Sequence, residues 1–205
     1  MTNIIQGSQE WFESRIGKVT ASRVADVLAT IKTGESASRK NYRMELVCQR
    51  LTGQREEGFT NSHMERGIEL EPLARAAYEF KQGVTVTEVG FIDHPSIEMS
   101  GASPDGLVGL DGLVEIKCPT AANHADTLLS GKAPSKYIPQ MQWQMACTGA
   151  KWCDFVSYCP ALGDNLALFI VRVERDYEYI DEVQNAVKLF LTEVSDLTTK
   201  LKELK

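Results

Sequence analysis

Two acidic side chains and one lysine stand out in the stretch ASPDGLVGLDGLVEIKCP, residues 102–119, which is otherwise rich in glycine and aliphatic residues. Side chains alternate between the two faces of a strand, so Glu115 and Lys117 are expected on the same face. If a hairpin turn centres on Asp111, Asp105 lies roughly opposite Lys117, at a cross-strand separation of about 5 Å. Two carboxylates and an ammonium would then share one small region.

This combination of groups indicates a metal-dependent reaction. Mg²⁺ prefers hard oxygen ligands and usually takes one or two protein carboxylates, together with waters and substrate phosphate. A bound cation lowers the pKa of a water, and a lysine beside it can stabilise that water or help to deprotonate it. The pattern therefore predicts hydrolysis of a phosphodiester. The alternative is a surface hairpin with an ordinary Glu–Lys face.

The composition sets the broad class of the protein. The 205 residues are 43% hydrophobic and 24% charged, which predicts one folded domain over residues 1–205. No apolar run approaches the length of a membrane span, and no secretory signal is evident. The five scattered cysteines argue against a disulfide framework and favour a reducing compartment.

The net charge of −6 argues by itself against nucleic-acid binding, since proteins that bind nucleic acids are usually basic. The distribution of charge can override this total. Acidic residues at a metal site count as negative in the sum but are neutralised once the metal binds.

Helix-like and strand-like patterns predict an α/β or α+β domain in which helices flank a central mixed sheet. Pro72 is expected in the first turn of its helix, where proline is tolerated. The apolar residues of the last helix alternate spacings of three and four, which indicates packing on the same subunit or an intersubunit seam. Helices are expected at residues 10–29 with a break near Gly17, 41–51, 64–82, 136–149 and 176–205, and strands at 84–92, 98–102, 106–117 (a hairpin), 152–159 and 166–173.

The residues Pro-Asp at 104–105 and Glu-Ile-Lys at 115–117 resemble the signature of the PD-(D/E)xK nuclease superfamily, which has a restriction-endonuclease-like core. Two further blocks narrow the resemblance, WFESRIGKVTAS at 11–22 and YIPQMQWQM at 137–145. Together they resemble the phage-type exonuclease family, which includes lambda exonuclease and the YqaJ-type viral recombinases. The resemblance covers residues 9–158, with the blocks in the same order.

The resemblance implies a catalytic centre in the opening stretch. Asp105 and Glu115 would ligate the metal, with the backbone carbonyl of Ile116 as a further ligand. Lys117 would activate or orient the attacking water. The implied cofactor is Mg²⁺, with Mn²⁺ as an alternative, at two ions per active site.

Two more catalytic residues follow from the resemblance. Glu71 matches an acidic residue on a helix beside the metal site, where it would act through a second metal ion or a metal-bound water, with Glu69 as a weaker substitute. Gln140 matches an active-site glutamine, a neutral donor near the scissile phosphate or the attacking water. Gln142 and Gln144 are interpreted as a polar helix surface.

A third group of residues is implied to bind DNA. Arg15, Thr20 and Ser22 match the residues that bind the terminal 5′-phosphate, and a guanidinium fork and a helix N-terminus both suit phosphate oxygens. Lys32 and Met64 match, more weakly, an arginine and an apolar residue that act as a wedge at the duplex end. Such a wedge can unstack base steps. Tyr137, which flanks the glutamine block, is a further candidate for DNA contact.

The expected function is a Mg²⁺-dependent 5′→3′ exonuclease on double-stranded DNA. It would resect 5′-phosphorylated ends, release 5′-mononucleotides and leave 3′ single-stranded tails for phage-type recombination. The family also implies a homotrimeric ring, a single-strand-annealing recombinase as partner, and the cytoplasm of a bacterial host of a phage or prophage. The alternatives are a site-specific endonuclease on the same core and a non-catalytic module that binds DNA ends.

Overall fold

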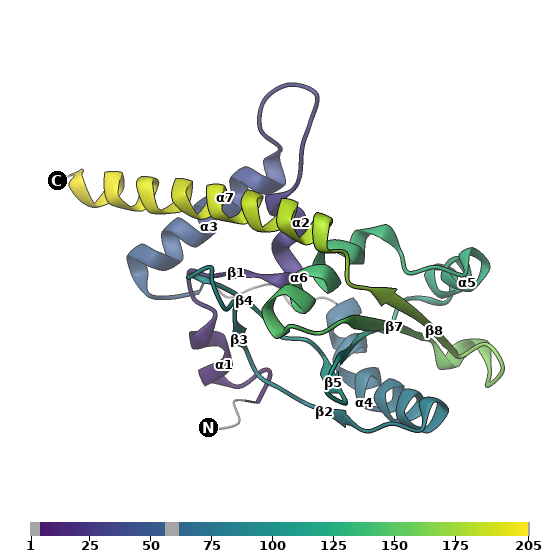
Figure 1. Cartoon of the computed structure of the whole chain (residues 1–205). Helices are drawn as coiled ribbons and strands as arrows, with labels where there is room; N and C mark the ends of the chain where they lie inside the picture. The colour runs from purple at the N-terminus through teal and green to yellow at the C-terminus, as the bar shows by residue number, and fades with distance from the viewer. Residues whose placement is uncertain (1–4, 56–61, 205) are drawn as a thin grey trace.

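The larger of the two sheets in the described residues is a five-stranded mixed sheet (Figure 1). The structure is a computed structural model that describes residues 5–55 and 62–204, with side chains from residue 65 onward in the second range. β6 and β7 run parallel, and the other neighbours in the sheet run antiparallel. The strand order is β2 (Val86–Thr87), β5 (Gly106–Val108), β6 (Gly112–Lys117), β7 (Trp152–Tyr158) and β8 (Leu168–Glu174).

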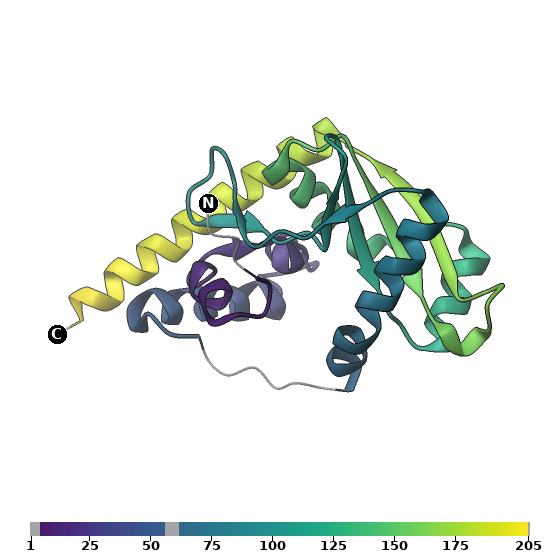
Figure 2. The same ribbon diagram turned by 90° about the horizontal axis from the view of Figure 1, so that it is seen from below.

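Successive strand residues point to opposite faces of this sheet, and both faces carry apolar side chains. Each face is therefore covered by a helix. α4 (Ser62–Gln82) packs Ala74 and Tyr78 against one face of β6 and β7, and Figure 2 shows this helix lying across the sheet. α6 (Ile138–Thr148) packs Met141 and Met145 on the opposite face, where Leu113 also lies. The mixed sheet between helices confirms the predicted fold class. Within the described residues, no helix has both the length and the apolar character needed to cross a membrane.

A second core lies beside the sheet, next to a three-stranded sheet in the order β1 (Val19–Thr20), β4 (Ser100–Ala102) and β3 (Ile92–Asp93). It is formed by α2 (Val24–Val27), α3 (Ala37–Thr52), part of α6, and α7 (Tyr177–Glu203). The apolar stripe of α7 is buried as far as Val194, which confirms packing on its own subunit over that length. Leu204 near the end is exposed, and Figure 1 shows this end of α7 extending past the other elements.

Three expectations about helices are wrong. α3 begins at Ala37 and not near residue 41, because the Ser36 hydroxyl accepts a hydrogen bond from the Arg39 N–H and caps the helix. Pro72 lies inside α4, well past its first turn, where the packing of Ala74 and Tyr78 on the sheet offsets the missing hydrogen bond. α5 (Ala121–Ser130) was not expected at all.

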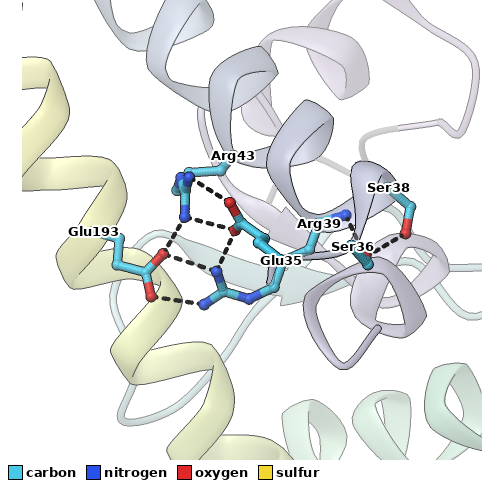
Figure 3. A network of polar contacts seen from close by, with 6 residues as sticks. All are labelled: Glu35, Ser36, Ser38, Arg39, Arg43 and Glu193. Carbon is cyan, nitrogen blue, oxygen red and sulfur yellow. Dashed lines mark hydrogen bonds and ion pairs between the residues drawn. The ribbon is translucent and has the colours of Figure 1, made fainter. Parts of the chain in front are cut away.

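The loop between α2 and α3, which carries Lys32, is anchored by a network of charges at its end (Figure 3). Glu35 accepts hydrogen bonds from Arg39 at 2.6 Å and from Arg43 at 2.6 and 2.8 Å. Glu193 of α7 accepts from Arg39 at 2.7 and 2.9 Å and from Arg43 at 2.6 Å. Two arginines thus lie between two carboxylates, and they join the base of the loop to α3 and α7.

Glu193→Ala is expected to lower the free energy of unfolding by about 1–2 kcal/mol, because both guanidiniums lose charged acceptors at a partly exposed site. Urea unfolding followed by circular dichroism measures this. Glu182→Ala is the control, since Glu182 is an exposed glutamate on the same helix. Equal stabilities of the two variants would show that the network contributes nothing to stability.

Candidate active site

The β5–β6 hairpin sets the positions of the two acidic residues. Its register pairs Gly106 with Val114 and Val108 with Gly112, so one further step places Asp105 opposite Glu115. The expectation that Asp105 lies opposite Lys117 is therefore wrong. Gly112 belongs to the strand and not to the turn.

The cause of this register is a pair of glycines with different surroundings. Gly109 adopts a φ of +61° and begins the turn, a conformation that glycine tolerates without strain. At Gly112 the ring of Trp152 on β7 lies so close that an added Cβ would be 2.1 Å from it. Only glycine fits beside Trp152 at position 112, where it pairs with Val108, and the turn comprises residues 109–111.

Asp105, Glu115 and Lys117 form a compact charged group. The Asp105 carboxylate accepts a hydrogen bond from the Ile116 N–H at 2.6 Å, and the fully buried Glu115 forms an ion pair with Lys117. Burial, followed by the negative charge of Glu115, raises the pKa of Asp105 well above its usual 3.8. Burial alone would lower the pKa of Lys117, but Glu115 and Asp105 outweigh it and raise that pKa. The three groups are thus electrostatically coupled.

Asp105 and Lys117 border a cavity of about 980 Å³, and the buried Glu115 lies behind Lys117. Asp105, Ile116 and Lys117 line it from the hairpin, and Glu71 lines it from α4. The charge of Glu71 contributes to the raised pKa of Asp105. The Glu71 carboxylate also accepts a hydrogen bond from Arg75 at 2.8 Å. The structure therefore brings Glu71 to the same site as Asp105.

The carboxylates suit a divalent cation, because two acidic groups crowded at a buried place are costly without added positive charge. The described residues hold no group of three or more His, Cys, Asp or Glu side chains that could enclose a metal. Asp105 and Glu115 are the two carboxylates that the hairpin places opposite each other. A set of one or two carboxylates completed by water and substrate is typical of Mg²⁺.

Two of the three glutamines of α6 contact Glu115, and the third contacts the start of α7. Gln140 and Gln144 each donate to Glu115 at 2.6 Å, one to each carboxylate oxygen. Gln142 donates to the Glu174 carbonyl and accepts from the Asp176 N–H, which fixes the start of α7. The interpretation of Gln142 and Gln144 as surface residues is wrong. Their exposed fractions are 2% and 0%, because α6 lies between two cores.

The predicted phosphate-binding residues follow α1 (Gln9–Ser14). The Arg15 guanidinium stacks 3.8 Å from the centre of the Trp11 ring, and no carboxylate of the described residues pairs with it. Thr20 Oγ1 and Ser22 Oγ lie 3.5 Å apart at the start of a short 3₁₀ turn. Trp11 lines the cavity and donates to Ser103 at 2.9 Å, which connects α1 to the segment before Asp105.

Arg55 is a basic residue near this group that the sequence did not single out. It lies 4.6 Å from the ring of Phe12, the neighbour of Trp11. Burial lowers the pKa of Arg15 to about 10, with a smaller contribution from the charge of Arg55. Two guanidiniums close enough to affect each other favour an anion between or beside them. No local sequence signal links residues 15 and 55.

Of the remaining candidates for DNA contact, Tyr137 lies at the cavity and Lys32 does not. Tyr137 lines the cavity, stacks on Phe155 with 5.5 Å between ring centres, and lies 5.4 Å from the Lys117 ammonium. Lys32 is exposed on its loop, outside the cavity. The Met64 side chain lies outside the described residues.

Comparisons with solved structures show similar chains. The crystal structure of an alkaline exonuclease (LHK-Exo) from Laribacter hongkongensis is 54% identical, with 95% of this chain and 96% of that chain covered and a TM-score of 0.88. Its complex with dAMP, with the same identity and coverage, gives a TM-score of 0.90. A phage-related exonuclease from Haemophilus somnus 129PT, at 16% identity, coverage of 90% and 96%, and a TM-score of 0.70, shares the fold.

Sequence comparisons identify the family. Uncharacterized protein R354 of Acanthamoeba polyphaga mimivirus is 28% identical over 165 residues, which are 74% of this chain. The chain spans only 28% of the length of that relative. The sequence model of the YqaJ-like viral recombinase domain matches residues 10–151, well over half of the chain. The chain therefore belongs to the YqaJ-like viral recombinase domain family.

Proposed function

We propose that the protein is a Mg²⁺-dependent 5′→3′ exonuclease that resects 5′-phosphorylated ends of double-stranded DNA. The observation that carries this proposal is that Asp105, Lys117 and Glu71 line one cavity, while Glu115 pairs with Lys117 and accepts a hydrogen bond from Gln140. The 54% identity to an alkaline exonuclease supports the reaction, and the dAMP complex of that relative supports a mononucleotide product.

Asp105, Glu115 and the Ile116 carbonyl would hold the first cation, and Glu71 would contribute to a second. Mn²⁺ could replace Mg²⁺, because both accept carboxylate and water ligands. When bound, the cation supplies Lewis acidity toward the phosphate and lowers the pKa of a water. Lys117 orients the attacking water from the cavity wall, and Gln140 offers an uncharged N–H donor to the same region.

The 5′-phosphate is proposed to bind at Arg15, Thr20 and Ser22. Arg15 has no carboxylate partner among the described residues, and its stacking on Trp11 fixes the plane of the guanidinium. Trp11 also reaches Ser103, two residues before Asp105. The terminal phosphate and the bond to be cut are therefore held by connected parts of the structure.

A linear duplex with one 5′-phosphate end and one 5′-hydroxyl end tests the proposed function. In Mg²⁺, resection from the phosphorylated end with release of 5′-mononucleotides is expected, together with a 3′ single-stranded tail. Closed circular DNA should stay intact, and its cleavage would favour a site-specific endonuclease. Binding of ends without any turnover would favour a non-catalytic module.

Arg15→Ala is expected to reduce the preference for the phosphorylated end about 10-fold to 100-fold, because hydrogen bonds to a charged group contribute roughly 1.5–3 kcal/mol. The ratio of initial rates on the two ends measures it. The hydroxyl end in the same reaction is the control, and its rate should change little. An unchanged ratio would remove Arg15 from the phosphate site.

The proposed assembly is a homotrimeric ring threaded by DNA. The protein then acts with a single-strand-annealing recombinase in the cytoplasm of a bacterial host, as a phage or prophage protein. Family membership supports this setting. Sedimentation of the purified protein tests the trimer, and co-sedimentation with a candidate annealing protein tests the partnership.

A further inference from the structure

The two oxygens of the Glu115 carboxylate have different environments. Oε1 accepts from Gln140 Nε2 at 2.6 Å and pairs with the Lys117 ammonium. Oε2 accepts from Gln144 Nε2 at 2.6 Å. Lys117 lines the cavity and Gln140 is half-buried, whereas Gln144 is fully buried. Glu115 does not itself line the cavity, but Oε1 contacts the cavity-lining Lys117 and is the oxygen nearer to it, whereas Oε2 contacts the fully buried Gln144.

Gln144 is held in place at some cost to the fold. Its own amide oxygen is buried and has no hydrogen-bond partner among the described residues. A buried acceptor without a partner is unfavourable, so an apolar residue would suit this position better if packing alone mattered. The orientation of the amide is nevertheless settled, because a flipped amide would point its oxygen at the Glu115 carboxylate. Its flanking residues Trp143 and Met145 are packed in two different cores and fix the helix at this point.

We propose that Gln144 is a positioning residue that occupies Oε2 of Glu115 permanently, so that only Oε1 can ligate a cation. Gln140 and Lys117 occupy Oε1 in the absence of metal and give way when a cation binds. The two glutamines lie one helical turn apart on one face of α6 but act in opposite ways. This inference rests on the proposed binding of Mg²⁺.

The consequence is a preference among cations. A carboxylate confined to one free oxygen suits Mg²⁺, which demands near-octahedral geometry with short bonds. Ca²⁺ accepts bidentate carboxylates and longer bonds. With Gln144 on Oε2 and that oxygen on the interior side, bidentate ligation by Glu115 is disfavoured, and the site discriminates against the larger ion.

Titration calorimetry of the DNA-free protein with Mg²⁺ and with Ca²⁺ tests the proposal. Gln144→Met, which keeps the length and removes the donor, should weaken Mg²⁺ binding about 10-fold to 100-fold, the usual effect of losing a group that orients a metal ligand. Ca²⁺ binding should weaken less. Gln140→Met should leave Mg²⁺ affinity unchanged or raise it, because it removes a competitor at Oε1.

Gln142→Met is the matched control, since Gln142 is a buried glutamine of the same helix whose amide contacts only backbone groups at the start of α7. It should lower thermal stability without changing metal affinity. Equal Mg²⁺ affinity in Gln144→Met and wild type, or equal losses in the Gln140 and Gln144 variants, would overturn the proposal. A wild-type protein that binds no Mg²⁺ would also overturn this inference, whereas absence of DNA hydrolysis in Mg²⁺ would refute the proposed function.

A measurement on wild type keeps the proposal testable if Gln144→Met fails to fold. Difference infrared spectra on adding Mg²⁺ report the splitting of the carboxylate stretches, and ¹³C labelling of the glutamate carboxylates separates the Glu115 band from that of Asp105. Monodentate splitting is expected. Bidentate splitting would contradict the assignment of Oε2 to Gln144.

Discussion

Asp105→Asn is expected to reduce DNA hydrolysis by about 10³-fold or more, while the metal-free protein stays folded and becomes as stable as wild type or more stable. Activity is lost because a bound cation stabilises the charge of the transition state by several kcal/mol. Each 1.36 kcal/mol lost from that stabilisation lowers the rate about tenfold. The gain in stability follows because Asn has the same shape and its carbonyl can accept the Ile116 N–H, while one of two crowded negative charges disappears.

The stability difference between Asp105→Asn and wild type should depend on pH in a defined direction. Burial and Glu115 raise the pKa of Asp105 above 3.8, so the folded, metal-free protein binds a proton more tightly than the unfolded chain. Wild-type stability from this group therefore rises as pH falls through the raised pKa toward about 3.8. The stability advantage of Asp105→Asn should be largest above that pKa and should shrink as the pH falls through it.

Thermal unfolding in chelator at a series of pH values, together with initial rates in Mg²⁺, measures both effects. Asp111→Asn is the matched control, because Asp111 lies in the turn of the same hairpin and is exposed, where it pairs with Lys151. It should leave activity intact and show no pH-dependent gain. An Asp105→Asn variant with wild-type activity would refute the catalytic assignment.

The group around Asp105 was predictable in its members but not in its register. Alternation along a strand is set by backbone geometry, so Glu115 and Lys117 could be placed on one face from sequence alone. The turn could not be placed, because Gly109 and Gly112 both suit one. The requirement for glycine at position 112 comes instead from Trp152 on the next strand, which only the folded sheet brings near.

Gln144 shows a second limit of sequence reasoning. The spacing of Gln140 and Gln144 puts both on one helical face, and that signal could have been used. A polar residue on a helix is nevertheless expected at the surface, and α6 is buried on all sides because Trp143 packs in one core and Met141 in another. Burial of this kind depends on how distant segments assemble, which the local pattern does not contain. The proximity of Arg55 to the Arg15 group is hidden for the same reason.

Lys117→Met is expected to reduce hydrolysis by about 10²-fold to 10⁴-fold, the range of a positioned proton donor or acceptor. Its effect on stability should be opposite to that of Asp105→Asn. Glu115 is fully buried and pairs with Lys117, so removal of the ammonium leaves two carboxylates without their cation, at a cost of about 3 kcal/mol. Because the pKa of Lys117 is raised above 10.5, its stabilising charge is fully present at neutral pH and is lost only in strong alkali.

Added Mg²⁺ should restore more stability to Lys117→Met than it adds to wild type, because the cation takes over the neutralisation of Glu115 and Asp105. Unfolding temperatures with chelator and with Mg²⁺ measure this difference. Lys151→Met is the matched control: Lys151 is 65% exposed and pairs with Asp111 in the same hairpin, so the same change of charge should have little effect. If Lys117→Met loses activity but keeps the metal-free stability of wild type, Lys117 is not the counter-ion that the buried carboxylate requires. In the metal-free protein, Glu115 would then be stabilised by the hydrogen bonds from Gln140 and Gln144 alone.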